Sequence, residues 1–380
     1  MAIKLLYLAF ARMPTEKAHG LTIAKSCEGF ARAGAEVTLV VPKRATPITD
    51  DIYTVYGVEH NFHFEQISVP DIFAHFPESK LAHRIHHGLF LAAVALRLLF
   101  GSRQTIIYAR EPQACVLSQL GYRVVYECHH IFDRSPRFFA LARRAHRIVT
   151  ISHALKRTFL DAGFDERRIL VAPSGVDLAV FGVELPRNDA RRQLDLPLAA
   201  KIAVYTGNFT TMDQDKGIHD IILALKDVPT VTFVAVGGRA DDIERYEREA
   251  RGAGVLDRVV LRGFAPQKEL AVYQKAADML LMPFPDTPHY RNHMSPVKMF
   301  EYMASGVPII ATDLPTITEV LNRENAIIIP PGDAKALAAA MTDLMSDNHR
   351  ASVLAQRARE EVAAFTWNRR SQNIVQSLTL

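Results

Sequence analysis

The 380-residue sequence is notable first for what it lacks. It has no run of 18 uncharged apolar residues, so we expect no membrane-spanning helix. The first ten residues, MAIKLLYLAF, pass into a polar segment without a small-residue cleavage site, so we expect no secretion signal. Its three cysteines, Cys27, Cys115 and Cys128, match neither a metal-binding nor a disulfide spacing. Reduced thiols in a cytoplasmic protein are the simplest interpretation.

A strong overall charge is also missing, since the net charge is only +4. The two halves nevertheless differ: residues 1–180 hold 22 Lys and Arg against 16 Asp and Glu, whereas residues 181–380 hold 23 against 25. The basic residues are scattered and no nucleic-acid-reading motif accompanies them, which argues against nucleic-acid binding. An anionic acceptor or membrane surface would suit the basic half, and an uneven solvated surface is the alternative.

Short apolar runs alternate with helix-compatible segments along the whole chain. A strand at 3–10, a helix at 22–33 and a strand at 36–41 predict one βαβ unit. Such alternation predicts parallel sheets covered on both faces, here an α/β fold of two Rossmann-like, doubly wound domains facing across a cleft. We expect domains at 1–182 and 183–362. Further strands are predicted at 105–109, 124–126, 148–151, 169–172, 201–207, 230–237, 258–261, 279–283, 307–312 and 326–329.

The stretch SPVKMFEYMASGVPIIATD, residues 295–313, predicts a short helix followed by a strand. Ser295 suits the N-cap, Pro296 the first helical position and Gly306 the left-handed residue that ends the helix. Lys298 then falls in the first turn, where the helix dipole is already positive. This position is favourable if an anion such as a diphosphate binds there, and the alternative is a solvated lysine.

Several segments together carry a family resemblance. The stretch at 295–313 resembles the signature of the family 4 glycosyltransferases, retaining enzymes of the GT-B architecture. Matching segments follow in family order from about residue 3 to 375. They are VYECHHI, TISHALKRTFLDAGFDERRILVAPSGVDLAVF, YTGNFTTMDQDKGIHDII, AADMLLMP and FTWNRR.

The resemblance implies transfer of a sugar from a UDP- or GDP-linked donor to a hydroxyl acceptor, such as a lipid or cell-surface glycan intermediate. It implies neither a metal nor a cofactor beyond the donor. It also implies that residues 363–380 form a helix that packs back on the N-terminal domain. A catalytically silent nucleotide-sugar binder of the same fold is the alternative, and a GT-B epimerase or phosphorylase is a weaker one.

Three residues carry the central roles in this resemblance. Lys216 matches the lysine that contacts the donor phosphates, where negative charge grows as the nucleotide departs. Glu301 matches the glutamate that accepts hydrogen bonds from the ribose hydroxyls. His129 matches the histidine near the donor sugar and is expected to orient it. In such enzymes a donor phosphate oxygen is thought to take the acceptor proton, so no protein base is required.

Two donor-site positions depart from the family pattern. His293 stands where the first glutamate of a pair is usual, and Asn208 stands where an arginine is usual. Lys298, Arg291 or Arg239 could supply the missing cation, and we favour Lys298 because of its place at the helix start. The full set of donor-binding residues implied is Gly207, Asn208, Arg262, Gly263, Phe264, His293, Ser295, Pro296, Val297 and Lys298.

Three further segments have two interpretations each. The loop Lys17, Ala18, His19 and Gly20 falls where the family has two glycines that approach the diphosphate and acceptor, and local chain turning is the alternative. The DQD at 213–215 imitates a metal-binding motif, but its place beside Lys216 argues against a metal. The apolar stretch at 81–101 predicts a core helix, or, together with the basic stretch at 134–147, a surface that approaches membrane lipid.

Overall fold

The computed structural model describes residues 3–72, 76, 79–131 and 133–379. The chain divides into two compact units. Unit 1 comprises Met1–Pro173 together with Trp367–Leu380, and unit 2 comprises Ser174–Thr366. The chain therefore passes between the units twice, at 173/174 and 366/367, compared with the domain boundaries expected at 182/183 and 362/363.

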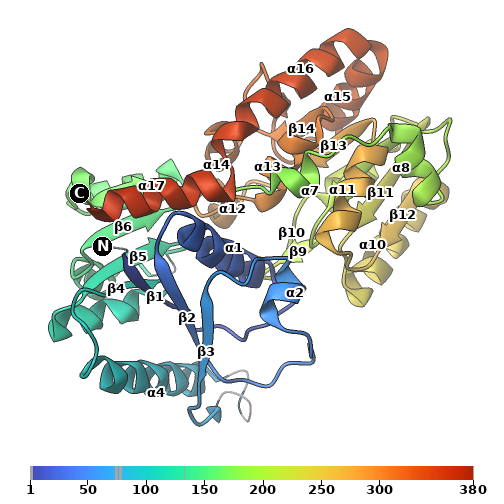
Figure 1. The fold of residues 1–380 in the computed structure, drawn as a ribbon. Helices are drawn as coiled ribbons and strands as arrows, with labels where there is room; N and C mark the ends of the chain where they lie inside the picture. Colours follow the sequence, from blue (N-terminus) through green and yellow to red (C-terminus); the bar gives the residue numbers. More distant parts are fainter. Residues whose placement is uncertain (1–2, 73–75, 77–78, 132, 380) are drawn as a thin grey trace. The chain divides into compact units, whose positions relative to one another are not determined.

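Unit 1 is built on a seven-stranded parallel sheet in the order β3-β2-β1-β4-β5-β6-β7 (Figure 1). This is a Rossmann-like order, and its topological switch point lies between β1 and β4, where ligands bind beyond the carboxyl ends of such strands. The strands are β1 (Lys4–Leu8), β2 (Glu36–Pro42), β3 (His63–Ile67), β4 (Ile106–Ala109), β5 (Arg123–Cys128), β6 (Arg147–Thr150) and β7 (Ile169–Val171).

Both faces of this sheet are buried because successive side chains of each strand point to opposite faces. Leu5 and Tyr7 of β1 belong to one apolar core, and Leu6 and Leu8 belong to the other. The covering elements are α1 (Ala18–Arg32), α2 (Ile52–Tyr56), α4 (Lys80–Leu98), η1 (Pro112–Leu120), α5 (Pro136–Ala142), α6 (His153–Asp161), η2 (Glu166–Arg168) and α17 (Trp367–Thr379).

The last helix of the chain, α17, packs beside the first helix, α1 (Figure 1). Gly29 allows this close approach, since a Cβ atom at that position would lie 2.2 Å from the Oγ of Ser371. Trp367 is buried at the start of α17. The segment after residue 366 is thus part of the unit 1 core.

Unit 2 repeats the same arrangement with a six-stranded parallel sheet in the order β12-β11-β8-β13-β14-β15. Its switch point lies between β8 and β13. The strands are β8 (Lys201–Thr206), β11 (Val231–Val236), β12 (Val259–Arg262), β13 (Met279–Met282), β14 (Ile309–Thr312) and β15 (Ile327–Ile329), with a separate hairpin of β9 (Thr210–Thr211) and β10 (Gln214–Asp215).

Helices cover both faces of this second sheet as well. Val204 of β8 faces the core that contains Phe300, whereas Tyr205 faces the core that contains Ile221. The expected architecture of two doubly wound parallel sheets is therefore confirmed. The helical elements are α7 (Leu178–Phe181), α8 (Arg187–Gln193), α9 (Ile218–Ala224), α10 (Ala240–Gly252), η3 (Leu256–Arg258), α11 (Gln267–Ala276), α12 (Pro288–Asn292), α13 (Val297–Ser305), α14 (Pro315–Thr318), α15 (Ala334–Ser346), α16 (Asn348–Glu361) and η4 (Val362–Ala364).

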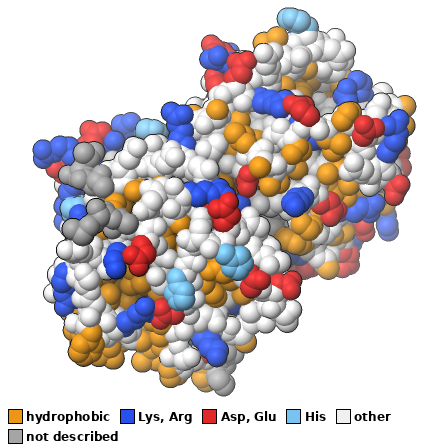
Figure 2. Space-filling view, in the orientation of Figure 1, with side chains coloured by type: hydrophobic (Ala, Val, Ile, Leu, Met, Phe, Trp, Pro, Cys, Tyr) orange, Lys and Arg blue, Asp and Glu red, His pale blue; other side chains and the backbone are white. Residues whose placement is uncertain are grey.

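The surface carries charges of both signs on each unit in the face that Figure 2 shows. Among the described residues, none of the helices combines the length and the apolar character needed to cross a lipid bilayer.

Candidate functional site

The start of α13 is the first part of the candidate site. The helix begins at Val297, one residue later than expected, and Pro296 occupies the N-cap. The N-cap prediction for Ser295 was wrong because its Oγ accepts a hydrogen bond from the backbone N–H of Ser174 instead, at 2.8 Å. No side chain caps the helix, so its first backbone N–H groups remain available to a ligand. Gly306 ends the helix in the left-handed conformation as predicted, with φ 69°.

Lys298, in the first turn of α13, is a buried lysine without a hydrogen-bond acceptor among the described residues. Its residue is only 9% exposed, and its Nζ has no hydrogen-bond acceptor in the described part of the chain. The Nζ atom lies 3.3 Å from the centre of the Tyr205 ring at the end of β8. Burial, followed by the charge of Lys216, holds the pKa of Lys298 well below its ordinary value. An uncompensated buried cation of this kind favours a bound anion.

The neighbouring end of β8 leaves room for this lysine. Gly207 has φ +103°, and a Cβ atom there would come within 3.4 Å of the Cε of Lys298. The other two candidate cations are already used, since Arg239 pairs with Asp242 and Arg291 pairs with Asp286. Of the three, Lys298 alone lacks a carboxylate or other acceptor among the described residues.

Lys216 follows the β9–β10 hairpin, which is the form that the segment after Asn208 takes. The backbone N–H of Lys216 donates to the carbonyl of Phe209 at 3.1 Å, which fixes the end of the hairpin. Burial, partly offset by the charge of Asp242, lowers the pKa of the Lys216 ammonium to about 8. Burial thus disfavours the protonated forms of both Lys216 and Lys298.

The DQD segment has a structural role in this hairpin. Asp215 accepts hydrogen bonds from the backbone N–H of Gly217 and from the hydroxyl of Tyr246. Asp213 is exposed at the hairpin tip in the left-handed region, with φ 58°. Asp215 therefore stabilises the loop, whereas Asp213 faces solvent.

Glu301 lies one turn after Lys298 on the same side of α13. Its residue is 7% exposed, and burial, partly offset by the charge of Lys298, raises the pKa of its carboxyl to about 7. Tyr302, next along the helix, accepts a hydrogen bond of 2.8 Å from the backbone N–H of Thr206 in β8. The polar side chains Lys298, Glu301 and Tyr302 of α13 are thus all buried: Tyr302 anchors the helix to the sheet, and Lys298 and Glu301 are its ionisable groups.

The remaining donor-site candidates lie at the carboxyl ends of neighbouring strands or helices. His293 is buried at the end of α12. Asn208 is exposed, and its carbonyl accepts a hydrogen bond of 2.8 Å from Tyr205. The carbonyls of Arg262 and Gly263 both accept from the backbone N–H of Gly237. Phe264, which follows them, has an aromatic side chain that is 75% exposed.

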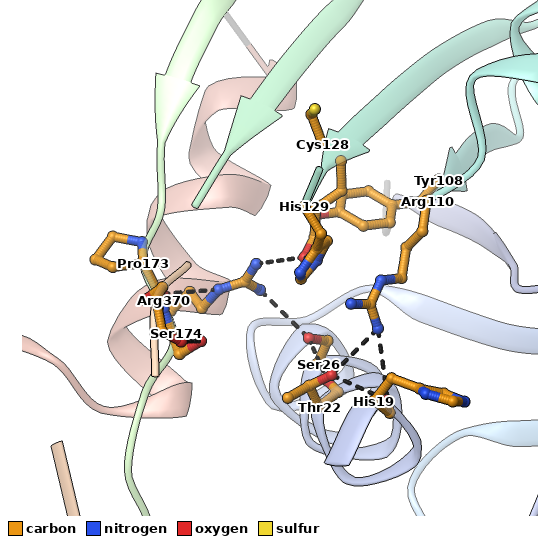
Figure 3. Close-up of polar contacts among 12 residues, drawn as sticks. His19, Thr22, Ser26, Tyr108, Arg110, Cys128, His129, Pro173, Ser174 and Arg370 are labelled. Carbon is orange, nitrogen blue, oxygen red and sulfur yellow. Dashed lines mark hydrogen bonds and ion pairs between the residues drawn. The ribbon is translucent and has the colours of Figure 1, made fainter. Parts of the chain in front are cut away.

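A second polar cluster lies in unit 1, around His129 at the end of β5 (Figure 3). Glu127, nearly fully buried, accepts hydrogen bonds from His129, from the hydroxyl of Tyr108 and from Arg370 of α17, the last at 2.8 Å. Arg370 is held in turn by the carbonyl of Pro173 at 3.0 Å and by Ser26 at 3.3 Å. The cluster therefore joins β4, β5, α1 and α17.

The charges of this cluster fix the protonation of His129. Burial alone would raise the pKa of Glu127, but Arg370 and His129 outweigh it and hold that pKa well below the ordinary value. Burial and the charge of Arg110 lower the pKa of His129 to about 4. His129 is then neutral at pH 7, and because an ionised carboxylate only accepts, its Nε2 donates to Glu127. The Nδ1 atom remains as an acceptor.

The segment expected to be a loop at Lys17 to Gly20 is instead the start of α1. Lys17 is the N-cap, and Ala18, His19 and Gly20 form the first turn. Gly20 has a packing role, because a Cβ atom there would lie 2.2 Å from the hydroxyl of Tyr56. The loop prediction was wrong because these residues form the first turn of the helix, where Gly20 packs closely against Tyr56 of α2.

Arg110, directly after β4, ties the start of α1 to the switch point of the unit 1 sheet (Figure 3). It donates to the hydroxyl of Thr22 at 3.1 Å and lies 3.5 Å from the carbonyl of His19. Neither Arg110 nor Arg370 is among the site residues predicted from the sequence. The buried residues of α17 recur at helical spacing, with Arg370 on the same stripe as Trp367 and Ile374. A cation on an apolar stripe is the signal that could have identified Arg370.

Comparison with known proteins identifies the family. Residues 21–180 match the description "Glycosyltransferase Family 4", and residues 200–347 match "Glycosyl transferases group 1". The chain belongs to the family 4 glycosyltransferases. Among curated relatives, the D-inositol 3-phosphate glycosyltransferase of Xylanimonas cellulosilytica is 29% identical over 216 residues, which are 54% of this chain and 50% of that protein. The chain spans about half the length of the curated relatives it matches.

Solved structures show that the family 4 chain has the GT-B fold. Anabaena Alr3699/HepE, solved in complex with UDP and glucose, superposes with a TM-score of 0.77 at 18% identity, covering 99% of both chains. Sucrose-phosphate synthase from Thermosynechococcus elongatus superposes with a TM-score of 0.75 at 22% identity, covering 99% of this chain and 98% of that one. At these identities the likeness concerns the fold alone.

Proposed function

We propose that the chain transfers a sugar from a nucleotide diphosphate donor to a hydroxyl acceptor, with retention of the anomeric configuration. The diphosphate binds at the first turn of α13 beside Lys216 and Lys298, and the ribose hydroxyls donate to Glu301. As the sugar leaves, negative charge grows on the phosphate, and the two cations stabilise that charge. Family membership supports the reaction class.

The observation that carries this proposal is the buried Nζ of Lys298, for which the described part of the chain supplies no hydrogen-bond acceptor. A buried ammonium without an acceptor is costly, and a phosphate oxygen would supply both the missing hydrogen bond and the compensating charge. The uncapped start of α13 adds backbone N–H donors at the same place. Two independent features of unit 2 therefore favour one anion position.

UDP is the first nucleotide to test. HepE, which shares the fold, was solved with UDP and glucose. The exposed ring of Phe264 offers an aromatic surface for a base, although such a surface does not distinguish uracil from guanine. GDP-linked donors are therefore the second choice.

Calorimetric titration of UDP into the wild-type chain and the Lys298→Met variant tests the proposal. We expect the Kd for UDP to rise roughly tenfold to a hundredfold in the variant, as for loss of one charge-assisted hydrogen bond. UMP should show a smaller change, because it lacks the β-phosphate.

Lys275→Met is the matched control. Lys275 is the other buried lysine of unit 2, but its Nζ already donates to the carbonyl of Ser305 at 2.6 Å. The control should leave the Kd for UDP within about twofold of wild type. Equal losses in both variants would remove the argument for a phosphate site at Lys298.

The mechanistic details of the proposal have their own tests. We propose that His129 orients the transferred sugar and that neither a metal nor another cofactor takes part, since Lys216 and Lys298 supply the positive charge. Transfer should then survive a chelator. The anomeric configuration of the product, read by NMR, should match that of the donor, and inversion would contradict the retaining mechanism.

For the acceptor, we propose a hydroxyl-bearing lipid or glycan intermediate that binds in unit 1. A cavity of about 660 Å³ opens there beyond the carboxyl ends of β2 and β3, lined by Arg44, Thr46, Tyr53 and Gln66 among others. Its lining combines the cations Lys43 and Arg44 with the carboxylates Asp50, Asp51 and Asp71 and with hydroxyl and aromatic side chains, a mixture that suits the hydroxyl groups of a sugar. The cytoplasmic location expected from the sequence stays a prediction.

A catalytically silent nucleotide-sugar binder is the second candidate function. It is favoured by His293 and Asn208, which replace a carboxylate and a cation usual in the family. Release of UDP from UDP-sugars, measured with and without acceptors, separates the two functions. A chain that binds UDP with the expected dependence on Lys298 but releases no nucleotide from any donor would be the silent binder.

A further inference from the structure

Helix α4 exposes an apolar face to solvent in addition to the apolar face that it buries, whereas an ordinary surface helix exposes polar side chains. Residues His86, Phe90, Val94 and Leu98 point into the unit 1 core, which is the expected buried stripe. The opposite side is also apolar. Its exposed side chains recur at helical spacing and continue past the end of the helix: Leu81 (66% exposed), Ile85 (43%), Leu89 (37%), Leu96 (64%), Leu99 (50%) and Phe100 (95%). We call these six residues the α4 face.

The α4 face lies along the lower edge of unit 1 in Figure 1, and hydrophobic side chains gather there in Figure 2. A contiguous exposed apolar surface of this kind marks an interaction site, whereas isolated exposed leucines do not. From Leu81 to Leu96 the stripe runs for roughly 22 Å at the rise of an α-helix. This length fits a helix that lies in an interface and not one that crosses a bilayer.

The Lys, Arg, Asp and Glu side chains that α4 itself contributes have one sign. Residues 79–110 contain Lys80, Arg84, Arg97, Arg103 and Arg110 and no aspartate or glutamate. Lys80 and Arg84 are exposed beside the first turns of the stripe, and neither has an ion-pair partner within the described ranges. Arg97 forms an ion pair with Glu65 of β3, and the Nδ1 of His86 lies 2.9 Å from Asp71. An apolar face bordered by unneutralised cations is the pattern that binds anionic lipid.

The same charge pattern argues against a second copy of the chain as the occupant. A symmetric contact places the same patch on both partners, so Lys80 and Arg84 would meet like charges with no carboxylate in the segment to balance them. The stretch at 134–147 contributes less than expected from the sequence. Phe138 and Phe139 are half-buried and pack with Phe159, so they are turned toward the core.

We infer that the α4 face docks unit 1 onto an anionic membrane surface, with α4 lying in the plane of the headgroups. Leu96 and Phe100 enter the acyl boundary, and Lys80 and Arg84 contact lipid phosphates. This inference does not depend on the transfer reaction, because it concerns an exposed surface of unit 1 and not the residues proposed to bind the donor.

Vesicle co-sedimentation of the full chain tests the inference. The two vesicle types are phosphatidylcholine alone and phosphatidylcholine with about one-third phosphatidylglycerol. We expect binding to the anionic vesicles that weakens in high salt. Leu96→Ser with Phe100→Ser should lower the partition coefficient at least tenfold. Lys80→Gln with Arg84→Gln should lower it roughly tenfold to thirtyfold, on anionic vesicles only.

The matched control is Leu198→Ser with Val353→Ser, a pair of exposed apolar residues in unit 2, at 46% and 50% exposure. It should bind vesicles as wild type does, and all variants should unfold at the wild-type temperature because the changed side chains are exposed. No binding to anionic vesicles, equal binding to neutral ones, or equal loss in the control would overturn the inference. A concentration-dependent dimer that Leu96→Ser with Phe100→Ser abolishes would instead make a second copy the occupant.

Discussion

Arg370 of the last helix donates a hydrogen bond of 2.8 Å to Glu127 at the end of β5, 243 positions earlier in the chain. Both side chains are almost fully buried, at 4% and 2% exposure. The pair joins the final helix of the chain to the centre of the unit 1 sheet. The carboxylate of Glu127 also accepts the hydrogen bond from His129.

The first prediction concerns the stability of this pair. Arg370→Met should lower the free energy of unfolding by about 3 kcal/mol, because it leaves the charge of Glu127 buried without its main partner. Glu127→Gln should cost a similar amount. The double variant should cost clearly less than the sum, since it removes both charges together. Denaturant unfolding of the four proteins measures this coupling.

Arg167→Gln provides the reference for an exposed pair in the same unit. Arg167 bonds to Asp165 with 89% of its own side chain exposed, so its loss should change the free energy of unfolding by less than about 0.5 kcal/mol. Strict additivity of Arg370→Met and Glu127→Gln would show that the two residues do not act as a pair.

The second prediction concerns the protonation of His129. Its pKa of about 4 lies below the ordinary value, so the ring should stay neutral from pH 8 down to about pH 5. Nitrogen NMR of the imidazole should show Nε2 protonated and Nδ1 bare throughout that range. In Arg370→Met the pKa of His129 should rise, because a nearby cation has been removed. A titration midpoint near 6.5 in the wild-type chain would contradict the assigned tautomer and orientation.

The third prediction uses the raised pKa of Glu301, which is about 7. The carboxylate form, which accepts the ribose hydroxyls, is populated above pH 7 and is lost as the pH falls below it. Glu301→Gln should therefore weaken UDP binding roughly tenfold at pH 8.5 and hardly at all at pH 5.5. The ratio of the two Kd values, measured by calorimetry across that range, isolates Glu301 from the titration of the lysines. A ratio that does not change with pH would contradict the proposed hydrogen bonds from the ribose hydroxyls to Glu301.

The fourth prediction concerns the loss of the Lys216 charge as the pH rises. Its pKa of about 8 means that the ammonium is present below pH 8 and is lost above it. UDP affinity should fall between pH 7 and 9.5 in the wild-type chain. Lys216→Arg should lose less affinity over that range, because a guanidinium stays charged. If the two proteins lose affinity in parallel, the falling charge belongs to another group.

Much of the fold could be predicted from the sequence because buried parallel strands leave continuous apolar runs. The runs at 201–207, 230–237 and 279–283 became β8, β11 and β13. Strand β3, with the sequence HFEQI, was missed because it lies at the edge of the sheet and is largely polar. The β9–β10 hairpin was also missed, since its strands have only two residues each.

The donor-site residues were predicted from local signals, whereas the unit 1 cluster depends on distant contacts. A lysine in the first turn of α13 can be read from one segment. Arg370 and Glu127, by contrast, meet only after the chain has returned to unit 1, and no spacing in the sequence encodes that pairing. The same limit explains why the N-cap prediction for Ser295 was wrong. Its hydroxyl accepts a hydrogen bond from the backbone N–H of Ser174, a residue more than a hundred positions away.

We propose that a nucleotide diphosphate occupies the start of α13. A crystal structure of the chain with UDP tests it most directly. We predict a diphosphate oxygen at roughly 3 Å from the Nζ of Lys298, with another facing the backbone N–H groups of the first helical turn. UDP bound elsewhere, with the Nζ of Lys298 still over the ring of Tyr205 and no phosphate oxygen beside it, would contradict this site.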